Sequence, residues 1–192
     1  SRLGHPPRGA DRGHRVMRTP VTGGIRSGKS ALAENLLDAD ATYVAPAPGR
    51  DDDPDWAARI RDHRARRPAS WRTVETSDLP GALATLTGPA LVDSLGGWLV
   101  TALDRLQAWD QPVADWRSAL DREVSAVVAA WLACPHDVVA VTDEVGFGGI
   151  AEHRSARVFA DELGRLNQAV AGASDRVLLV VAGQVLTLKD DA

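Results

Sequence analysis

The stretch from Gly23 to Ser30, which reads GGIRSGKS, constrains this chain more than any other feature. It fits the pattern G-x-x-x-x-G-K-[ST], in which backbone N–H groups of a glycine-rich turn surround phosphates. In that pattern the lysine reaches the outer phosphate oxygens and the last hydroxyl binds Mg²⁺. Lys29 is one of only two lysines in the chain. The pattern therefore predicts a nucleoside triphosphate site, against the alternative of a flexible Gly/Ser turn.

The flanks of this octapeptide differ in how well they suit it. Downstream, residues 31–38 are good helix formers with leucines on one face, so we expect a helix that begins at the loop. Upstream, such a loop normally follows a buried apolar strand, but here Pro20 interrupts the apolar residues. We therefore expect the first strand to be short or irregular.

Beyond the loop, short β-type runs alternate with longer helical stretches. The expected strands are residues 41–45, 71–74, 90–93, 137–143 and 176–182, and the expected helices are residues 31–38, 54–66, 79–86, 96–109, 113–133 and 152–173. Alternation of this kind indicates a parallel sheet covered by helices. The prediction is an α/β fold that is P-loop NTPase-like (RecA-like), with a mainly parallel sheet and helices on both faces.

The length of 192 residues suits one domain, which we place at residues 17–192. We expect residues 1–16 to be a disordered or non-native extension, because the first twenty residues contain five arginines, glycines and prolines but no apolar run. The first twenty residues carry a local charge of +4, which leaves −8 for the rest of the chain, given the total of −4. This balance disfavours a nucleic-acid-binding protein.

Cysteine usage and hydropathy limit the setting of the chain. The single cysteine, Cys134, excludes an intrachain disulfide framework, and no apolar stretch approaches the length of a membrane span. We therefore expect a cytoplasmic location. Three other features have ordinary explanations: the tryptophans suit core positions, Cys134 suits a buried apolar site, and His153 suits a solvated helix start.

A second candidate site combines a histidine with arginines in residues 55–75. On a helix, His63 shares a face with Arg59, and Arg66 and Arg67 follow it. A neutral imidazole can attack phosphorus as a nucleophile, while guanidinium groups neutralise the transferring and leaving phosphates. The spacing alone favours the alternative of a solvated, arginine-rich helix that carries an incidental histidine.

Several segments together resemble the bifunctional adenosylcobinamide kinase / adenosylcobinamide-phosphate guanylyltransferase family of cobalamin biosynthesis. They run in family order from about residue 17 to residue 189. Besides the octapeptide, the most specific are HRARRPASWRT from His63 to Thr73, the Glu144 to Gly146 segment, and GRLNQ from Gly164 to Gln168. The octapeptide alone would indicate only a nucleotide-binding superfamily.

The resemblance implies two reactions on one polypeptide. The family phosphorylates a hydroxyl of adenosylcobinamide with ATP or GTP, and then transfers GMP from GTP onto that phosphate with release of pyrophosphate. It does so through a guanylylated histidine, and the matching position here is His63. It also implies Mg²⁺, a homotrimer with sites between subunits, and adenosylcobinamide and adenosylcobinamide phosphate as partners.

The site residues follow from the resemblance together with the residue types. Those expected at the nucleotide are Gly23, Gly24, Ile25, Arg26, Ser27, Gly28, Lys29, Ser30, Ala45, Pro46, Ala47, Arg64, Ala65, Arg66, Arg67, Glu75 and Asp93. Ser30 and Asp93 are the expected Mg²⁺ ligands, since an acid that ends an apolar strand suits a Walker-B position. The alternative for Asp93 is a strand-terminal cap. Glu75 could accept the N–H groups of guanine, against the alternative of a surface glutamate.

The chain departs from the family pattern at three places. Asp143 stands where the family commonly has Asn, and Ser94 replaces the Cys that usually follows the Asp at position 93. Pro20 lies in the opening strand. No departure removes a phosphate-binding residue or His63, although Asp143 changes the local charge. Two other function classes stay open: a P-loop kinase for another small metabolite, and a regulatory nucleotide-binding module without turnover.

Overall fold

The computed structural model describes residues 15–37, 40–47, 67–149 and 151–191. Its helices and strands alternate along most of the chain. In order, they are β1 (Arg18–Gly23), α1 (Lys29–Asn35), β2 (Thr42–Ala45), β3 (Arg72–Glu75), α3 (Leu79–Ala84), β4 (Ala90–Asp93), α4 (Leu95–Arg105), α5 (Val113–Ala133), β5 (Val138–Val141), α6 (Arg154–Gly172), β6 (Arg176–Val181) and β7 (Gln184–Asp190).

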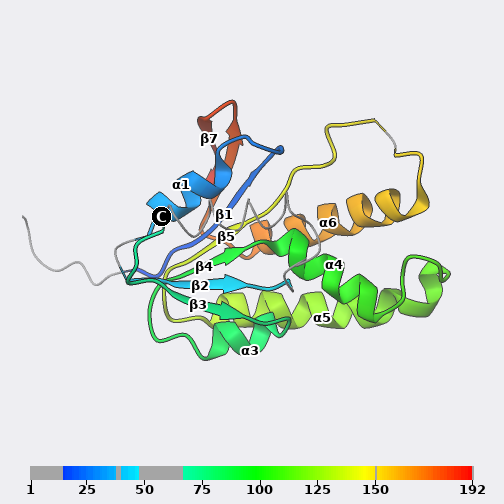
Figure 1. Ribbon diagram of the computed structural model, residues 1–192, viewed down its shortest axis with the longest axis horizontal. Helices are drawn as coiled ribbons and strands as arrows, with labels where there is room; N and C mark the ends of the chain where they lie inside the picture. Colours follow the sequence, from blue (N-terminus) through cyan, green and yellow to red (C-terminus); the bar gives the residue numbers. More distant parts are fainter. Residues whose placement is uncertain (1–14, 38–39, 48–66, 150, 192) are drawn as a thin grey trace, which may run out of the picture.

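The strands of the described residues form one sheet in the order β3-β2-β4-β5-β1-β6-β7 (Figure 1). Every neighbouring pair from β3 to β6 is parallel, whereas β7 is antiparallel to β6. Because parallel strands require crossover connections, helices lie between most of them in the chain. The predicted α/β fold with a mainly parallel sheet is confirmed.

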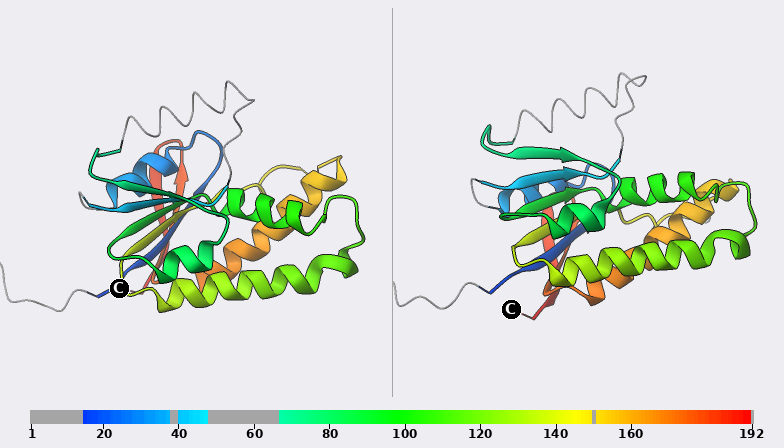
Figure 2. Two further views of the ribbon diagram at one scale, coloured as in Figure 1. Left: turned by 60° about the horizontal axis from the view of Figure 1, so that its bottom comes forward. Right: turned by 90° about the horizontal axis from the view of Figure 1, so that it is seen from below.

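Helices pack on both faces of this sheet (Figure 2). Alternate residues of one strand point to opposite faces. Val141 of β5 and Val21 of β1 share a buried cluster with Ala33 of α1 on one face. Val138 of β5 and Val92 of β4 belong to the larger cluster with α3, α4, α5 and α6 on the other. None of the helices in the described part of the chain has the length and apolar character that crossing a membrane requires.

The first strand contradicts the expectation drawn from Pro20. β1 has six residues, lies inside the sheet and is buried from Thr19 to Gly23. Pro20 is level with Ala140 of β5, but β6 pairs with β1 only from Val21 onward. Since proline lacks a backbone N–H, it is tolerated at a point where only one neighbouring strand is paired. The expectation of a short or irregular strand was wrong.

Two further elements differ from the sequence-based expectations. β7 was not predicted. Ala182 and Gly183, which precede it, form a short turn with φ of 50° and 76°. Two successive residues with positive φ are typical of a tight hairpin turn, which joins β6 to β7. The helix expected at residues 54–66 lies outside the described residues.

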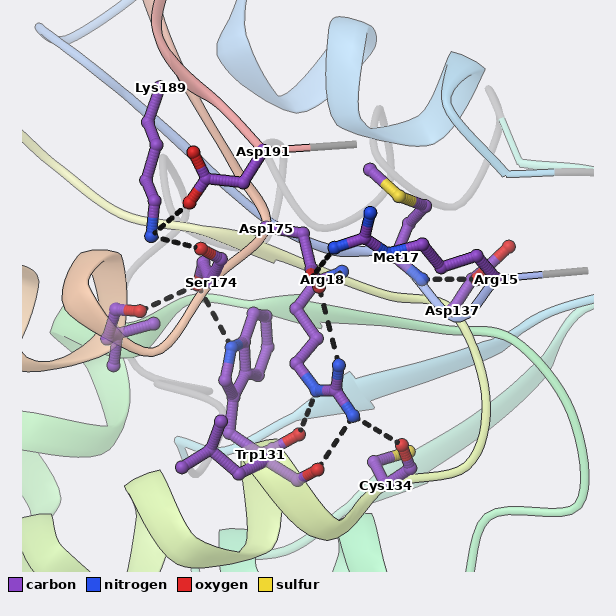
Figure 3. Close-up of polar contacts among 12 residues, drawn as sticks. Arg15, Met17, Arg18, Trp131, Cys134, Asp137, Ser174, Asp175, Lys189 and Asp191 are labelled. Carbon is purple, nitrogen blue, oxygen red and sulfur yellow. Dashed lines mark hydrogen bonds and ion pairs between the residues drawn. The ribbon is translucent and has the colours of Figure 1, made fainter.

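A polar network joins elements at the amino ends of the strands, opposite the glycine-rich loop (Figure 3). The Arg18 guanidinium donates to the backbone carbonyls of Trp131 at 2.9 Å, Leu132 at 2.7 Å and Cys134 at 3.3 Å. It also pairs with Asp175 at 3.3 Å. The last carbonyls of a helix lack partners within the helix. Arg18 therefore satisfies the end of α5 and fixes it against β1.

Candidate nucleotide-binding site

The glycine-rich loop joins the carboxyl end of β1 to α1. A Cβ atom at Gly23 would lie 2.5 Å from the carbonyl oxygen of Val180, so only glycine allows this close approach to β6. Gly28 caps α1 with a φ of 100°, a conformation that favours glycine. Arg26 also has a positive φ, of 58°. The conformation of the loop thus accounts for glycines at both ends of the motif.

Lys29 lies buried beneath this loop. Its ammonium nitrogen donates to the carbonyl oxygen of Gly24 at 3.1 Å and forms an ion pair with Oδ1 of Asp143 at 2.7 Å. The turn between β6 and β7 also holds the loop, because the N–H of Gly183 donates to the carbonyl of Ser27 at 2.9 Å. The lysine of the motif is therefore placed next to the residues that precede it in the loop.

Asp143 follows β5 and is fixed from two directions. The backbone N–H groups of its neighbours donate to β1: that of Thr142 to the carbonyl of Val21 at 3.0 Å, and that of Glu144 to the carbonyl of Gly23 at 3.1 Å. The side chain of Asn167 on α6 donates to the Asp143 carbonyl at 3.1 Å. The Oδ1 atom of Asn167 also accepts a hydrogen bond from the Thr142 hydroxyl at 2.6 Å.

Sequence reasoning named Asp143 only as a change of charge and gave Asn167 no role. The signal for Asp143 was its place directly after an apolar strand, at the sheet edge where the loop was expected. The contact of Asn167 could not be read from the sequence, because it depends on how α6 packs against β5. Both residues belong to the site through Lys29.

Asp93 ends β4, which lies one strand away from β1. It is level with Val141 of β5, and Val141 is level with Val21 of β1. The Tyr43 hydroxyl on β2 donates to Oδ2 of Asp93 at 3.2 Å. Burial, with the Asp93 carboxylate nearby, raises the pKa of Tyr43 well above its usual range, while Arg67 acts in the opposite direction. The hydroxyl therefore stays protonated and continues to donate to Asp93.

Arg67 is the described end of the arginine run. Its guanidinium carbon lies 3.5 Å from the centroid of the Tyr43 ring, a cation–π contact. Arg67 therefore contacts β2 beside the strand that carries Asp93. The other predicted residues of this segment, His63, Arg64, Ala65 and Arg66, lie outside the described residues.

The remaining predicted residues lie at the carboxyl ends of β2 and β3. Glu75 ends β3 level with Ala45 of β2, and the N–H of Thr76 donates to the Ala45 carbonyl at 3.0 Å. A Cβ atom at Gly97, at the start of α4, would lie 3.1 Å from the Cβ atom of Ala47. Pro46, between the two alanines, is buried. The predicted residues that the structure describes thus lie along the edge where β1, β2, β3 and β4 end.

The donors at this edge fit Mg²⁺. Ser30 offers a hydroxyl and Asp93 a carboxylate, both hard oxygen ligands. The described residues contain no group of three or more His, Cys, Asp or Glu side chains suited to a metal. Mg²⁺ does not need one, because it is usually held by one or two carboxylates together with phosphate oxygens and water. Ser30 and Asp93 would therefore hold the ion only with a bound nucleotide.

Comparison with known proteins finds a family model and relatives that agree with one another. The family model described as cobinamide kinase / cobinamide phosphate guanyltransferase matches residues 19–188. The chain is 41% identical to the bifunctional adenosylcobalamin biosynthesis protein CobU of Salmonella typhimurium, over 88% of this chain and 98% of that protein. Identity is 38% to the protein of the same name from Escherichia coli, with the same coverage. It is 37% to bifunctional adenosylcobalamin biosynthesis protein CobP of Pseudomonas aeruginosa, over 91% and 99%.

A solved structure supports the fold alone. The chain resembles a prototypical ATPase from the type III secretion system of pathogenic bacteria, with a TM-score of 0.55 and 12% identity. The match covers 89% of this chain and 57% of the ATPase chain. The two chains therefore share a similar arrangement of sheet and helices.

Proposed function

The chain belongs to the cobinamide kinase / cobinamide phosphate guanyltransferase family, and we propose that it carries both reactions of adenosylcobalamin biosynthesis that this description names. Its relatives are called bifunctional, and the chain spans almost their full length. The observation that carries the proposal is the edge of the sheet where Lys29 lies under the phosphate-binding loop and Asp93 ends β4.

In the first reaction, a hydroxyl oxygen of adenosylcobinamide attacks the γ-phosphorus of a nucleoside triphosphate. The bond from that phosphorus to the β–γ bridging oxygen breaks, the nucleoside diphosphate leaves, and the hydroxyl proton passes to water. Lys29 neutralises phosphate charge in this step, and the loop from Gly23 to Ser30 orients the triphosphate. Ser30 and Asp93 would hold Mg²⁺, which would supply further neutralisation of phosphate charge.

In the second reaction, a nitrogen of His63 attacks the α-phosphorus of GTP and pyrophosphate leaves. A phosphate oxygen of adenosylcobinamide phosphate then attacks the same phosphorus and releases the imidazole, which yields adenosylcobinamide-GDP. Dividing the transfer into two displacements is the advantage of a nucleophilic side chain. Arg64, Arg66 and Arg67 would stabilise the phosphates, a role supported by the position of Arg67 against β2. Glu75 would receive the guanine N–H groups.

The assembly and extent of the enzyme are part of the same proposal. We expect a homotrimer formed by a domain of residues 17–192, in the cytoplasm. Self-association is supported by β7, an edge strand with exposed Val185, Leu186 and Leu188. The backbone groups of an edge strand can pair with a strand of another chain. Residues 1–14 lie outside the described residues. Sedimentation at several concentrations tests the trimer, and thermal melting with and without residues 1–16 tests the extent of the domain.

The direct test of the proposal follows both products in one reaction. Purified protein is incubated with adenosylcobinamide, Mg²⁺ and GTP, and the corrinoids are separated by chromatography and identified by mass. We expect adenosylcobinamide phosphate first and adenosylcobinamide-GDP afterwards. Phosphorylation without guanylyl transfer would instead favour a plain P-loop kinase, and no turnover would favour a regulatory module.

A further inference from the structure

The ion pair between Lys29 and Asp143 places a negative charge where the phosphates of a nucleotide must bind. In the loop pattern of this chain, the lysine serves the outer phosphate oxygens. Here the lysine nitrogen is 2.7 Å from Oδ1 of Asp143, and both side chains are largely shielded, with 10% and 33% of their surfaces exposed. A triphosphate therefore has to compete with a built-in carboxylate for Lys29, or share the lysine with it.

The main chain of Asp143 is fixed beside the loop. Its backbone carbonyl is held by Asn167, and the adjacent residues Thr142 and Glu144 are hydrogen-bonded to β1. Its second carboxylate oxygen, Oδ2, faces the start of α4, because a Cβ atom at Gly96 would lie 3.5 Å from it. The carboxylate thus lies between the phosphate-binding loop and the start of α4, which begins two residues after Asp93.

The electrostatic consequence depends on the metal. If a metal-free triphosphate takes Lys29, the Asp143 carboxylate is left beside several phosphate charges in a partly shielded place, which is unfavourable. A triphosphate that arrives with a divalent cation carries less negative charge and brings a positive charge to the same edge. Asp143 therefore penalises the metal-free nucleotide far more than the metal complex.

We propose that Asp143 is a specificity-determining residue that makes this site select metal-complexed over metal-free triphosphate. The inference rests on the proposed nucleotide site at Lys29, and it adds a property of that site. Asp143 acts by competing for Lys29 in the absence of the cation. It is a positioning residue and takes no part in breaking or forming bonds.

The test measures nucleotide binding by calorimetry, in Mg²⁺ and in EDTA. The probe is the α,β-methylene analogue of GTP, which keeps the triphosphate charge but has a methylene bridge that cannot be cleaved when His63 attacks the α-phosphorus. The wild type, Asp143→Asn and Asp143→Glu are compared. Glu144→Gln is the matched control, because it removes the same charge one residue away while its side chain can still accept the N–H of Gly146. Thermal melting establishes that each variant is folded.

We expect Asp143→Asn to lower the ratio of the Kd in EDTA to the Kd in Mg²⁺ about tenfold, within the range common for coupling between two ligands. Most of this change should come from tighter metal-free binding. Asp143→Glu and Glu144→Gln should keep a ratio close to that of the wild type. An unchanged ratio in Asp143→Asn would overturn this inference while leaving the proposed function intact. If the wild type binds no analogue even with Mg²⁺, the nucleotide site itself fails.

Discussion

The hydroxyl group of Tyr43 donates a hydrogen bond to Oδ2 of Asp93 over 3.2 Å, between the neighbouring strands β2 and β4. Only a protonated phenol can donate to a carboxylate, and burial raises the pKa of Tyr43 well above its usual range. The contact therefore persists at every pH at which the enzyme is expected to work. It fixes one oxygen of the acid that we assign to Mg²⁺.

The first prediction concerns the ionisation of Tyr43, the only tyrosine in the chain. Ultraviolet absorbance of phenolate should not rise near pH 10 in the folded protein, and should appear only at higher pH or on unfolding. The raised pKa also sets the sign of the stability effect. The contribution of Tyr43 to the free energy of unfolding is complete below the unfolded pKa of about 10 and is lost as the pH rises above it. An ordinary titration near pH 10 in folded protein would contradict the buried contact.

The second prediction concerns the same hydroxyl as a donor. Tyr43→Phe removes the hydrogen bond to Asp93 but keeps the ring under Arg67. Because a hydrogen bond to a charged group contributes about 1.5–3 kcal/mol, Mg²⁺-dependent nucleotide binding should weaken about tenfold or more. Calorimetry in Mg²⁺ and in EDTA separates this effect from a general loss of affinity, since the EDTA value should barely change. Equal affinities in Mg²⁺ would show that Tyr43 does not support the metal site.

The sequence predicted the parts of this site that depend on local patterns. The residues of the phosphate-binding loop, the strand that ends in Asp93 and the helix at residues 113–133 follow from motif and periodicity, and the structure has them where they were expected. Pro20 misled the prediction because its effect depends on where β6 begins to pair with β1. The contacts of Tyr43 with Asp93 and of Asn167 with Asp143 join residues far apart in the chain. They follow from strand order and helix packing, which local patterns do not specify.

The third prediction tests the network around Arg18. Arg18→Ala leaves three carbonyls near the end of α5 and the carboxylate of Asp175 without this donor. Charged hydrogen bonds of this kind imply a loss of about 3 kcal/mol in the free energy of unfolding. Arg176→Ala, which removes a partly exposed pair with Asp190, is the control and should cost less than about 1 kcal/mol. Urea unfolding measures both, and similar values for the two variants would contradict a special role of Arg18.

The fourth prediction uses the two lysines of the chain. Lys29→Ala should lower both kinase and guanylyl-transfer rates about 100-fold or more, because the ammonium group acts on phosphate charge in both reactions. Lys189→Ala is the control, since its nitrogen contacts the Ser174 carbonyl and Asp191 at the other end of the sheet. Rates of the two reactions, measured separately, should be nearly normal in the control. Normal turnover of GTP in Lys29→Ala would refute the assignment of the phosphate site.

The central claim, a bifunctional enzyme with His63 as its nucleophile, is tested most directly by the covalent adduct. The intact mass of wild-type protein mixed with GTP and Mg²⁺ should increase by one guanylyl group. The adduct should be labile to acid and stable to base, as a phosphoramidate of imidazole is. His63→Ala should show no adduct and should still phosphorylate adenosylcobinamide, whereas His153→Ala should be labelled like the wild type. A guanylyl group that persists in His63→Ala, or an adduct that survives acid, would contradict this mechanism.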